Sequence, residues 1–124
     1  MEKRKDVLSE KSMLFAIRIV RLYQYLVAEK KEFIMSKQLL RSGTNPGAMV
    51  REAGNAESGS DFIHKLGIAQ KELGETIYWL ELLFATEYLT KKEFDSIVKD
   101  AEEITRIVKS SILTKKRNIN SNSK

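Results

Sequence analysis

The chain has no cysteine, and its 124 residues include only one proline, one histidine and six glycines. Without cysteine it cannot form a disulfide framework, a thiolate zinc site or a cysteine nucleophile. The absence of cysteine fits a reducing compartment. Because prolines and glycines are so few, the chain has little material for turns, and long uninterrupted elements are expected.

Long hydrophobic runs are also missing. No segment reaches the roughly 18 consecutive apolar residues that a transmembrane helix needs. The basic start, residues 1–11, is not followed by the apolar run of a signal peptide. The length favours a single domain with a real hydrophobic core, and we expect the protein to be cytoplasmic.

Charge is distributed unevenly along the chain. Residues 1–51 carry eleven Lys and Arg against five Asp and Glu, a net charge of +6. Residues 52–114 carry seven against twelve, a net charge of −5, and residues 115–124 add four positive charges. The basic half could therefore meet a polyanion, or it could meet the acidic half of a neighbouring copy.

Apolar residues recur at helical spacing in four segments, beginning with residues 9–30. Ser9 is a plausible N-cap for this first helix, and residues 1–8 are expected to form a flexible charged arm. The apolar stripe of the helix consists of Phe15, Ile19, Leu22 and Leu26.

The second helix is expected to start between Phe33 and Ser36. Small residues in its middle would let a neighbouring helix come close. Pro46 costs about 3 kcal/mol in a helix interior and removes the hydrogen bond to Ser42. We predict one helix with a kink between Ser42 and Pro46, with two separate helices as the alternative.

The third helix follows a turn within residues 53–60, where Ser58 stands three residues before Asp61 at the spacing of a capping box. Its stripe alternates by four and three, which is typical of bundle packing; it consists of Phe62, Leu66, Ala69, Leu73, Thr76, Leu80 and Leu83. A second apolar face is the candidate oligomer interface, formed by Ile68, Tyr78, Trp79 and Leu82.

Thr90 and Glu93 form a full capping box that opens the fourth helix. Its stripe consists of Phe94, Ile97, Ala101, Ile104, Val108 and Ser111 or Ile112. The helix is expected to end near Leu113, and residues 115–124 read as a disordered basic tail. The four helices predict an all-α, antiparallel up-down four-helix bundle over residues 9–114.

Four sequence blocks resemble a known family: SGTNPGAM from Ser42, EAGNAES from Glu52, FIHKL from Phe62 and YWL from Tyr78. They are similar to blocks of the four-helix-bundle proteins encoded by intervening sequences within bacterial 23S rRNA genes, and the match covers roughly residues 9–114. The chain departs from the family pattern at Pro46, usually aliphatic, and at Met49, usually asparagine.

The resemblance implies a four-helix bundle that assembles into a homo-pentameric ring and has no established enzymatic activity. Nucleic-acid binding is the usual suggestion for the family. A more distant similarity is to the accessory protein of diversity-generating retroelements, a basic pentamer that binds a reverse transcriptase and RNA.

The residues themselves offer little for catalysis, so we expect no enzyme and no cofactor. Asp61 and His64 are the only pair at the Glu-x-x-His spacing of di-iron bundles, and a second pair is impossible with one histidine. No Gly-rich loop precedes a Lys-Ser or Lys-Thr pair, so a P-loop is excluded. No metal site is expected.

The main hypothesis is binding of the RNA or DNA backbone by a basic surface on the first two helices. Its candidate residues are Arg18, Arg21, Lys30, Lys31, Lys37, Arg41 and Arg51. These cations could instead solubilise the chain or pair with its acids. The tail, with Lys115, Lys116 and Arg117, could serve as a phosphate-binding arm. The alternative function is a protein-interaction module whose ring docks a protein partner.

Overall fold

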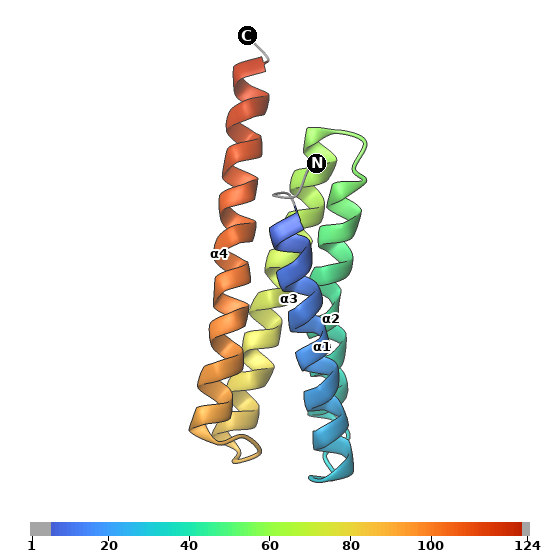
Figure 1. Ribbon diagram of the computed structural model, residues 1–124, viewed down its shortest axis with the longest axis vertical. Helices are drawn as coiled ribbons and strands as arrows, with labels where there is room; N and C mark the ends of the chain where they lie inside the picture. Colours follow the sequence, from blue (N-terminus) through green and yellow to red (C-terminus); the bar gives the residue numbers. More distant parts are fainter. Residues whose placement is uncertain (1–5, 123–124) are drawn as a thin grey trace.

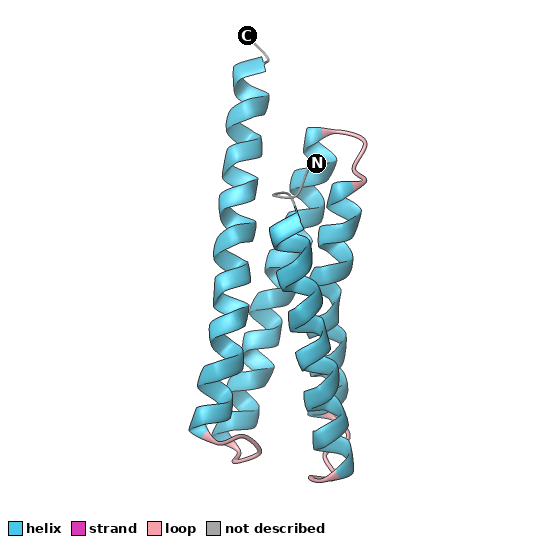
Figure 2. Cartoon of the chain, in the orientation of Figure 1, coloured by secondary structure: helices cyan, strands magenta, loops and turns pink. Residues whose placement is uncertain are grey.

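In the computed structural model, which describes residues 6–122, the chain forms α1 (Asp6–Ala28), α2 (Met35–Gly54), α3 (Gly59–Ala85) and α4 (Lys91–Asn122). Consecutive helices run in opposite directions and are joined by short loops (Figures 1 and 2). No strand occurs within the described range. The predicted all-α four-helix bundle is confirmed.

The predicted apolar stripes form the core. On α3, six of the seven residues of the stripe are buried, and Phe62 packs against them while partly exposed. The largest fully buried side chains come from all four helices and include Phe15, Ile19, Leu26, Leu39, Leu66, Leu73, Leu80, Leu83, Ile104 and Val108. None of the described helices has an apolar stretch long enough to cross a membrane.

The start of α1 differs from the prediction. Ser9 is not an N-cap, because the helix already includes Asp6 and Ser9 lies inside it. Leu8, about two turns before Phe15, packs against the core, so the helical stripe begins upstream of Ser9, which was used to place the start. Of the predicted arm, residues 1–5 lie outside the described range.

The end of α4 also differs. The segment predicted to be disordered from Lys115 is helical through Asn122, and this end of α4 projects beyond the other helices (Figure 1). Ile119 lies against Gly59, where an added Cβ would stand 2.7 Å from Ile119 Cδ1. Lys115 places its Nζ atom 4.9 Å from the centre of the Phe62 ring. These contacts, together with helix-favouring lysine and arginine, replace the missing apolar stripe.

The small residues of α2 bring it close to both neighbours. Ser42 and Thr76, both buried, are joined by a 3.0 Å hydrogen bond between α2 and α3. A Cβ on Gly43 would lie 2.7 Å from Ile19 Cγ1 on α1. Pro46 is fully buried within a single helix, so the alternative of two separate helices is wrong.

Two predicted caps are present. The Ser58 side chain accepts a 3.0 Å hydrogen bond from the Asp61 amide. Thr90 Oγ1 accepts from the Glu93 amide at 3.1 Å, and Glu93 Oε1 accepts from the Thr90 amide at 2.9 Å. Both bonds of the capping box therefore form, and they fix the start of α4.

A third cap, at the start of α2, has no simple sequence signature. Glu32 is buried, with 8% of its surface exposed. Its carboxylate accepts hydrogen bonds from the amides of Ile34 (3.2 Å), Met35 (3.0 Å) and Ser36 (2.7 Å). Burial is the largest single influence and would raise the pKa of Glu32, but these hydrogen bonds together outweigh it, so the pKa lies below its ordinary value of 4.5.

The close approach of Ile19 to Gly43 predicts the direction in which a substitution at Gly43 changes stability. Replacing a helical glycine by alanine gains about 1 kcal/mol of helix propensity, whereas overpacking a core costs about 1–3 kcal/mol. Cγ1 and Cγ2 of Ile19 would both lie under 3 Å from the new Cβ, so one rotation cannot clear both. We expect Gly43→Ala to lower the free energy of unfolding by up to about 2 kcal/mol. Urea denaturation measures it.

Gly74→Ala is the matched control, because a Cβ at this exposed helical position meets nothing within 4 Å. It should raise the free energy of unfolding by up to about 1 kcal/mol. If both variants shift stability in the same direction, α2 does not approach α1 as closely as the structure indicates.

The Glu32 cap predicts a pH dependence of stability. Because the folded pKa is lowered, the charged carboxylate stabilises the fold above pH 4.5, and this contribution is lost as the pH falls through the folded pKa. Glu32→Gln should cost about 1 kcal/mol at pH 7 and progressively less below pH 4.5. The measurement is thermal unfolding of both proteins across pH. A difference that does not change with pH would contradict the cap.

Candidate nucleic-acid interface

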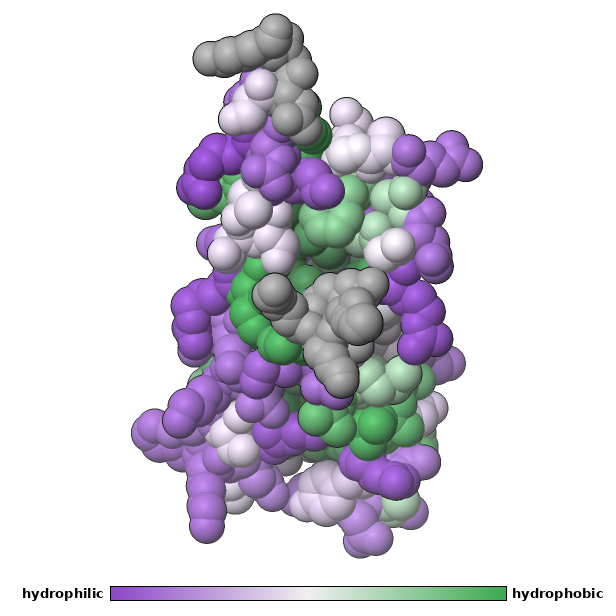
Figure 3. Space-filling model, turned by 45° about the horizontal axis from the view of Figure 1, so that its top comes forward, coloured by the Kyte–Doolittle hydropathy of each residue, from purple (hydrophilic) through white to green (hydrophobic). Residues whose placement is uncertain are grey.

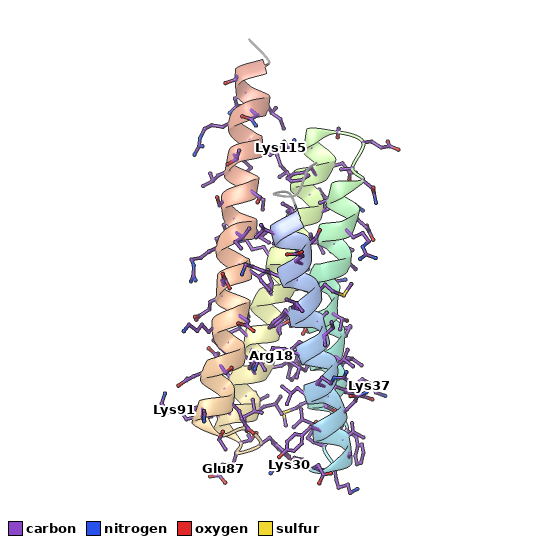
Figure 4. All side chains as sticks on the ribbon, in the orientation of Figure 1. Arg18, Lys30, Lys37, Glu87, Lys91 and Lys115 are labelled. Atoms are coloured by element: carbon purple, nitrogen blue, oxygen red, sulfur yellow. The ribbon has the colours of Figure 1, made fainter. Side chains whose placement is uncertain are left out.

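Arg18, on α1, turns toward α4 (Figure 4). Its guanidinium donates to Asp100 Oδ2 at 2.8 Å, to Ser96 Oγ at 3.1 Å and to the Ser96 carbonyl at 3.3 Å. A guanidinium with three internal acceptors is held by the bundle itself. Arg18 therefore joins two helices, its charge is paired with Asp100, and three of its five N–H donors are already used.

Arg41, on α2, turns the other way, toward α3. It donates to Glu72 Oε1 at 3.2 Å and also to Glu75 Oε2. The hydrogen bond from Arg41, followed by one from the indole of Trp79, lowers the pKa of Glu75. Arg18 and Arg41 are thus placed on different seams of the bundle and neutralised there.

The loop after α1 holds two further candidates. Lys31 has a positive φ of 55°, and its Nζ atom donates to the Ala28 carbonyl at 3.0 Å, which closes the end of α1. Lys30 places its Nζ atom 6.0 Å from the centre of the Tyr25 ring. Lys30 lies at the end of the bundle opposite to the end of α4 (Figure 4).

Arg21, Lys37 and Arg51 are exposed and have no ion partner within residues 6–122. Lys37 and Arg51 stand near opposite ends of α2, about 21 Å apart along the helix axis at 1.5 Å per residue. The fold therefore does not gather the seven candidate residues on one face of the first two helices.

A denser group of cations lies on α4. After Glu103, the described part of the helix contains five Lys and Arg and no acid, namely Arg106, Lys109, Lys115, Lys116 and Arg117. All except Lys115 are exposed, and none has an ion partner in the described part of the chain. In the sequence, this group is recognisable because no acid follows Glu103. The net charge summed over a longer segment does not show this, because the acids before Glu103 cancel the cations after it.

Arg51 joins this group in space. A cavity of about 700 Å³ opens at the same end of the bundle, and Arg51 and Lys115 both line it, together with apolar Phe62 and Leu66 and the acid Glu57. Figure 3, with this end turned forward, shows hydrophilic side chains over α4 and hydrophobic surface in places beside them. We call Arg51 together with the five cations of α4, Arg106, Lys109, Lys115, Lys116 and Arg117, the basic end.

The candidate oligomer interface on α3 is only partly exposed. Trp79 packs against the core and meets Tyr78 edge-on at 5.0 Å, while Tyr78 itself is 54% exposed. Ile68 and Leu82 are half-buried. A larger exposed apolar set lies on α1, where Leu14 is 62%, Met13 46% and Ile17 44% exposed.

His64 is exposed on α3. Within residues 6–122, no three His, Asp or Glu side chains are grouped so that they could hold a metal ion.

The chain is similar to one protein family and to a protein of known structure. The profile of the family described as 23S rRNA-intervening sequence protein matches residues 4–110. A crystal structure of a protein of unknown function, from the S23 ribosomal protein family of Bacteroides thetaiotaomicron VPI-5482, is 56% identical. It superposes with a TM-score of 0.86 over 87% of this chain and 96% of that chain. No curated protein matches.

Trp79 is the only tryptophan of the chain, and its indole donates a hydrogen bond to the Glu75 carboxylate at 3.1 Å. The fluorescence of Trp79 should therefore report the protonation of Glu75. Arg41 is the main reason that the pKa of Glu75 is lowered. The change in Trp79 emission on protonation of Glu75 should therefore occur below pH 4.5 in the parent protein and at higher pH in Arg41→Ala. Glu75→Gln, which cannot titrate, should abolish the step. Equal midpoints in the parent and Arg41→Ala would contradict the pairing.

Proposed function

The chain belongs to the 23S rRNA-intervening sequence protein family, and from this premise we propose that it is a non-enzymatic protein that binds the phosphate backbone of RNA or DNA. The observation that carries the proposal is the cation-only end of α4, where five Lys and Arg follow Glu103 without an acid. We therefore assign the proposed binding surface to the basic end, whereas the sequence pattern favours the first two helices.

The spacing of these cations suits a phosphate backbone. Arg106, Lys109 and Arg117 recur at three and eight residues along α4, so they lie near one outward face over about 16 Å at 1.5 Å per residue. Duplex DNA carries one phosphate charge per about 1.7 Å of axis, so a helix of this length faces several. The aromatic side chain beside these cations, Phe62, is partly buried and lies against Lys115, so recognition rests on charge and shape rather than on base sequence.

Charge reversal at two places tests this assignment. Fluorescence anisotropy with a structured RNA and a duplex DNA would compare the triple variant of Lys109, Lys116 and Arg117 to glutamate with the same change at Arg21, Lys30 and Lys37. Both variants lower the net charge equally. We expect the first to lose about tenfold or more in affinity, and its log–log salt dependence to become shallower by about 0.9 per lost phosphate contact on DNA.

A larger loss in the Arg21, Lys30 and Lys37 variant would move the surface to the first two helices. Equal losses would mean that only the total charge matters. If the parent protein binds neither ligand at low salt, the proposal fails. Circular dichroism of each variant confirms that the helices remain.

A second candidate function, a protein-interaction module, has its own support in the exposed apolar residues of α1. Leu14, Met13 and Ile17 are each between 44% and 62% exposed, and they share a helix face. A contiguous apolar face on a soluble protein marks a surface that another chain covers.

A further inference from the structure

The cavity at the basic end is lined by residues of all four helices and of the loop between α2 and α3. This loop lies at the same end of the bundle as the last turns of α4 (Figure 1). The apolar lining includes the buried Val50 and Leu66 and the half-buried Phe62 and Ile107. Pockets that hold a small organic molecule usually measure about 300–1,000 Å³. At about 700 Å³, this cavity has room for a nucleobase and its sugar.

Two cations and one acid line the same cavity, Arg51, Lys115 and Glu57. Arg51 is exposed and has no ion partner within residues 6–122. The Nζ atom of Lys115 stands 4.9 Å from the centre of the Phe62 ring, so this contact holds the ammonium beside the apolar lining. Positive charge therefore exceeds negative charge next to an apolar cavity. A nucleotide joins the two complementary parts, a flat base and an anionic phosphate.

We propose that this cavity takes one unpaired nucleotide of the nucleic acid that the basic end binds, with the base against the apolar lining and a phosphate at Arg51 and Lys115. The inference rests on the proposed function and names its class of ligand, which is a strand with unpaired bases in preference to a fully paired duplex. Paired bases are stacked inside the duplex and cannot enter a cavity, whereas the bases of unpaired strands can turn outward.

The cavity is continuous with the cations of α4. Lys115 lines it, the exposed Lys116 and Arg117 follow directly, and Ser111 lines it one turn before Lys115. From Ser111 to Arg117 the helix advances only about 9 Å at 1.5 Å per residue, so a strand whose phosphates contact these cations passes the cavity. Asn55 and Ser111 in the lining can each donate or accept a hydrogen bond. The cavity therefore favours an unpaired base without selecting one base over another.

Three DNA hairpins with one stem, labelled in the hairpin loop, test this by fluorescence anisotropy against the full chain. The first ends blunt, and the second ends in a fork of three unpaired deoxyadenosines on each strand. The third has the same fork made of abasic sugars, so its phosphates remain and its bases are missing. We expect the second to bind at least about tenfold tighter than the third, as contact with an unpaired base commonly gives. The third should exceed the first only by the effect of its added phosphates.

Filling the cavity then locates the site without changing any charge. Ser111 is half-buried and lines the cavity, whereas its neighbour Ser110 is exposed and does not line it. Ser111→Phe should abolish the preference for the forked over the abasic hairpin and leave the affinity for the blunt hairpin unchanged. Ser110→Phe, the matched control, should keep the full preference. Circular dichroism checks that both variants remain helical, and sedimentation velocity reports their oligomeric state.

Equal affinity of the parent protein for the forked and abasic hairpins would overturn the proposal, and this comparison needs no variant to fold. An unchanged preference in Ser111→Phe would also overturn it. So would a change of oligomeric state confined to Ser111→Phe, because a second copy would then cover the cavity. If the parent binds the blunt hairpin but does not distinguish the other two, this inference fails and the proposed function stands. If it binds none of the three at low salt, both fail.

Discussion

The close approach of α2 to its neighbours is the constraint on which the rest of the bundle depends. Ile19 occupies the space where a side chain at Gly43 would lie, and Ser42 is joined to Thr76 in the core. Each of these hydroxyls also bonds a carbonyl of its own helix, Thr76 to Glu72 and Ser42 to Leu39, so the bond between them fixes which residues of α2 and α3 face each other. The register of α2 against both α1 and α3 is thereby set, and α4 then packs on the apolar stripe of α3.

The seam between α1 and α4 is a consequence of this order. Two surface ion pairs cross it, Lys11 with Glu103 and Arg18 with Asp100, and each of these side chains is about two-fifths exposed. Arg18 also donates to Ser96 there. Surface ion pairs of this kind contribute little to stability. The α1–α4 seam is the least tightly closed of the bundle, and an apolar groove remains there. A smaller pocket opens in the α1–α2 seam beside Gly47 and Ala48.

Most of the fold follows from periodicity, since each helix shows its buried stripe at intervals of three and four, and the caps at Ser58 and Thr90 follow from local chemistry. The predicted helix ends are wrong where a few isolated contacts, rather than a continuous apolar stripe, extend the helix. Leu8 extends α1 past Ser9, and Ile119 against Gly59 holds a segment that has no stripe of its own. The Glu32 cap is missed because its carboxylate reaches three amides from outside the helix, a geometry that the spacing of residue types does not encode.

The candidate site was harder to predict, because the sequence shows charges but not their partners. The basic first half and the acidic second half of the chain are largely complementary within one molecule: Arg18 meets Asp100, and Arg41 meets Glu72 and Glu75 across 31 to 82 residues of sequence. Pairing within the fold cancels positive charge where acids are near. Excess positive charge in the described residues therefore persists where acids run out, and on α4 that point is Glu103.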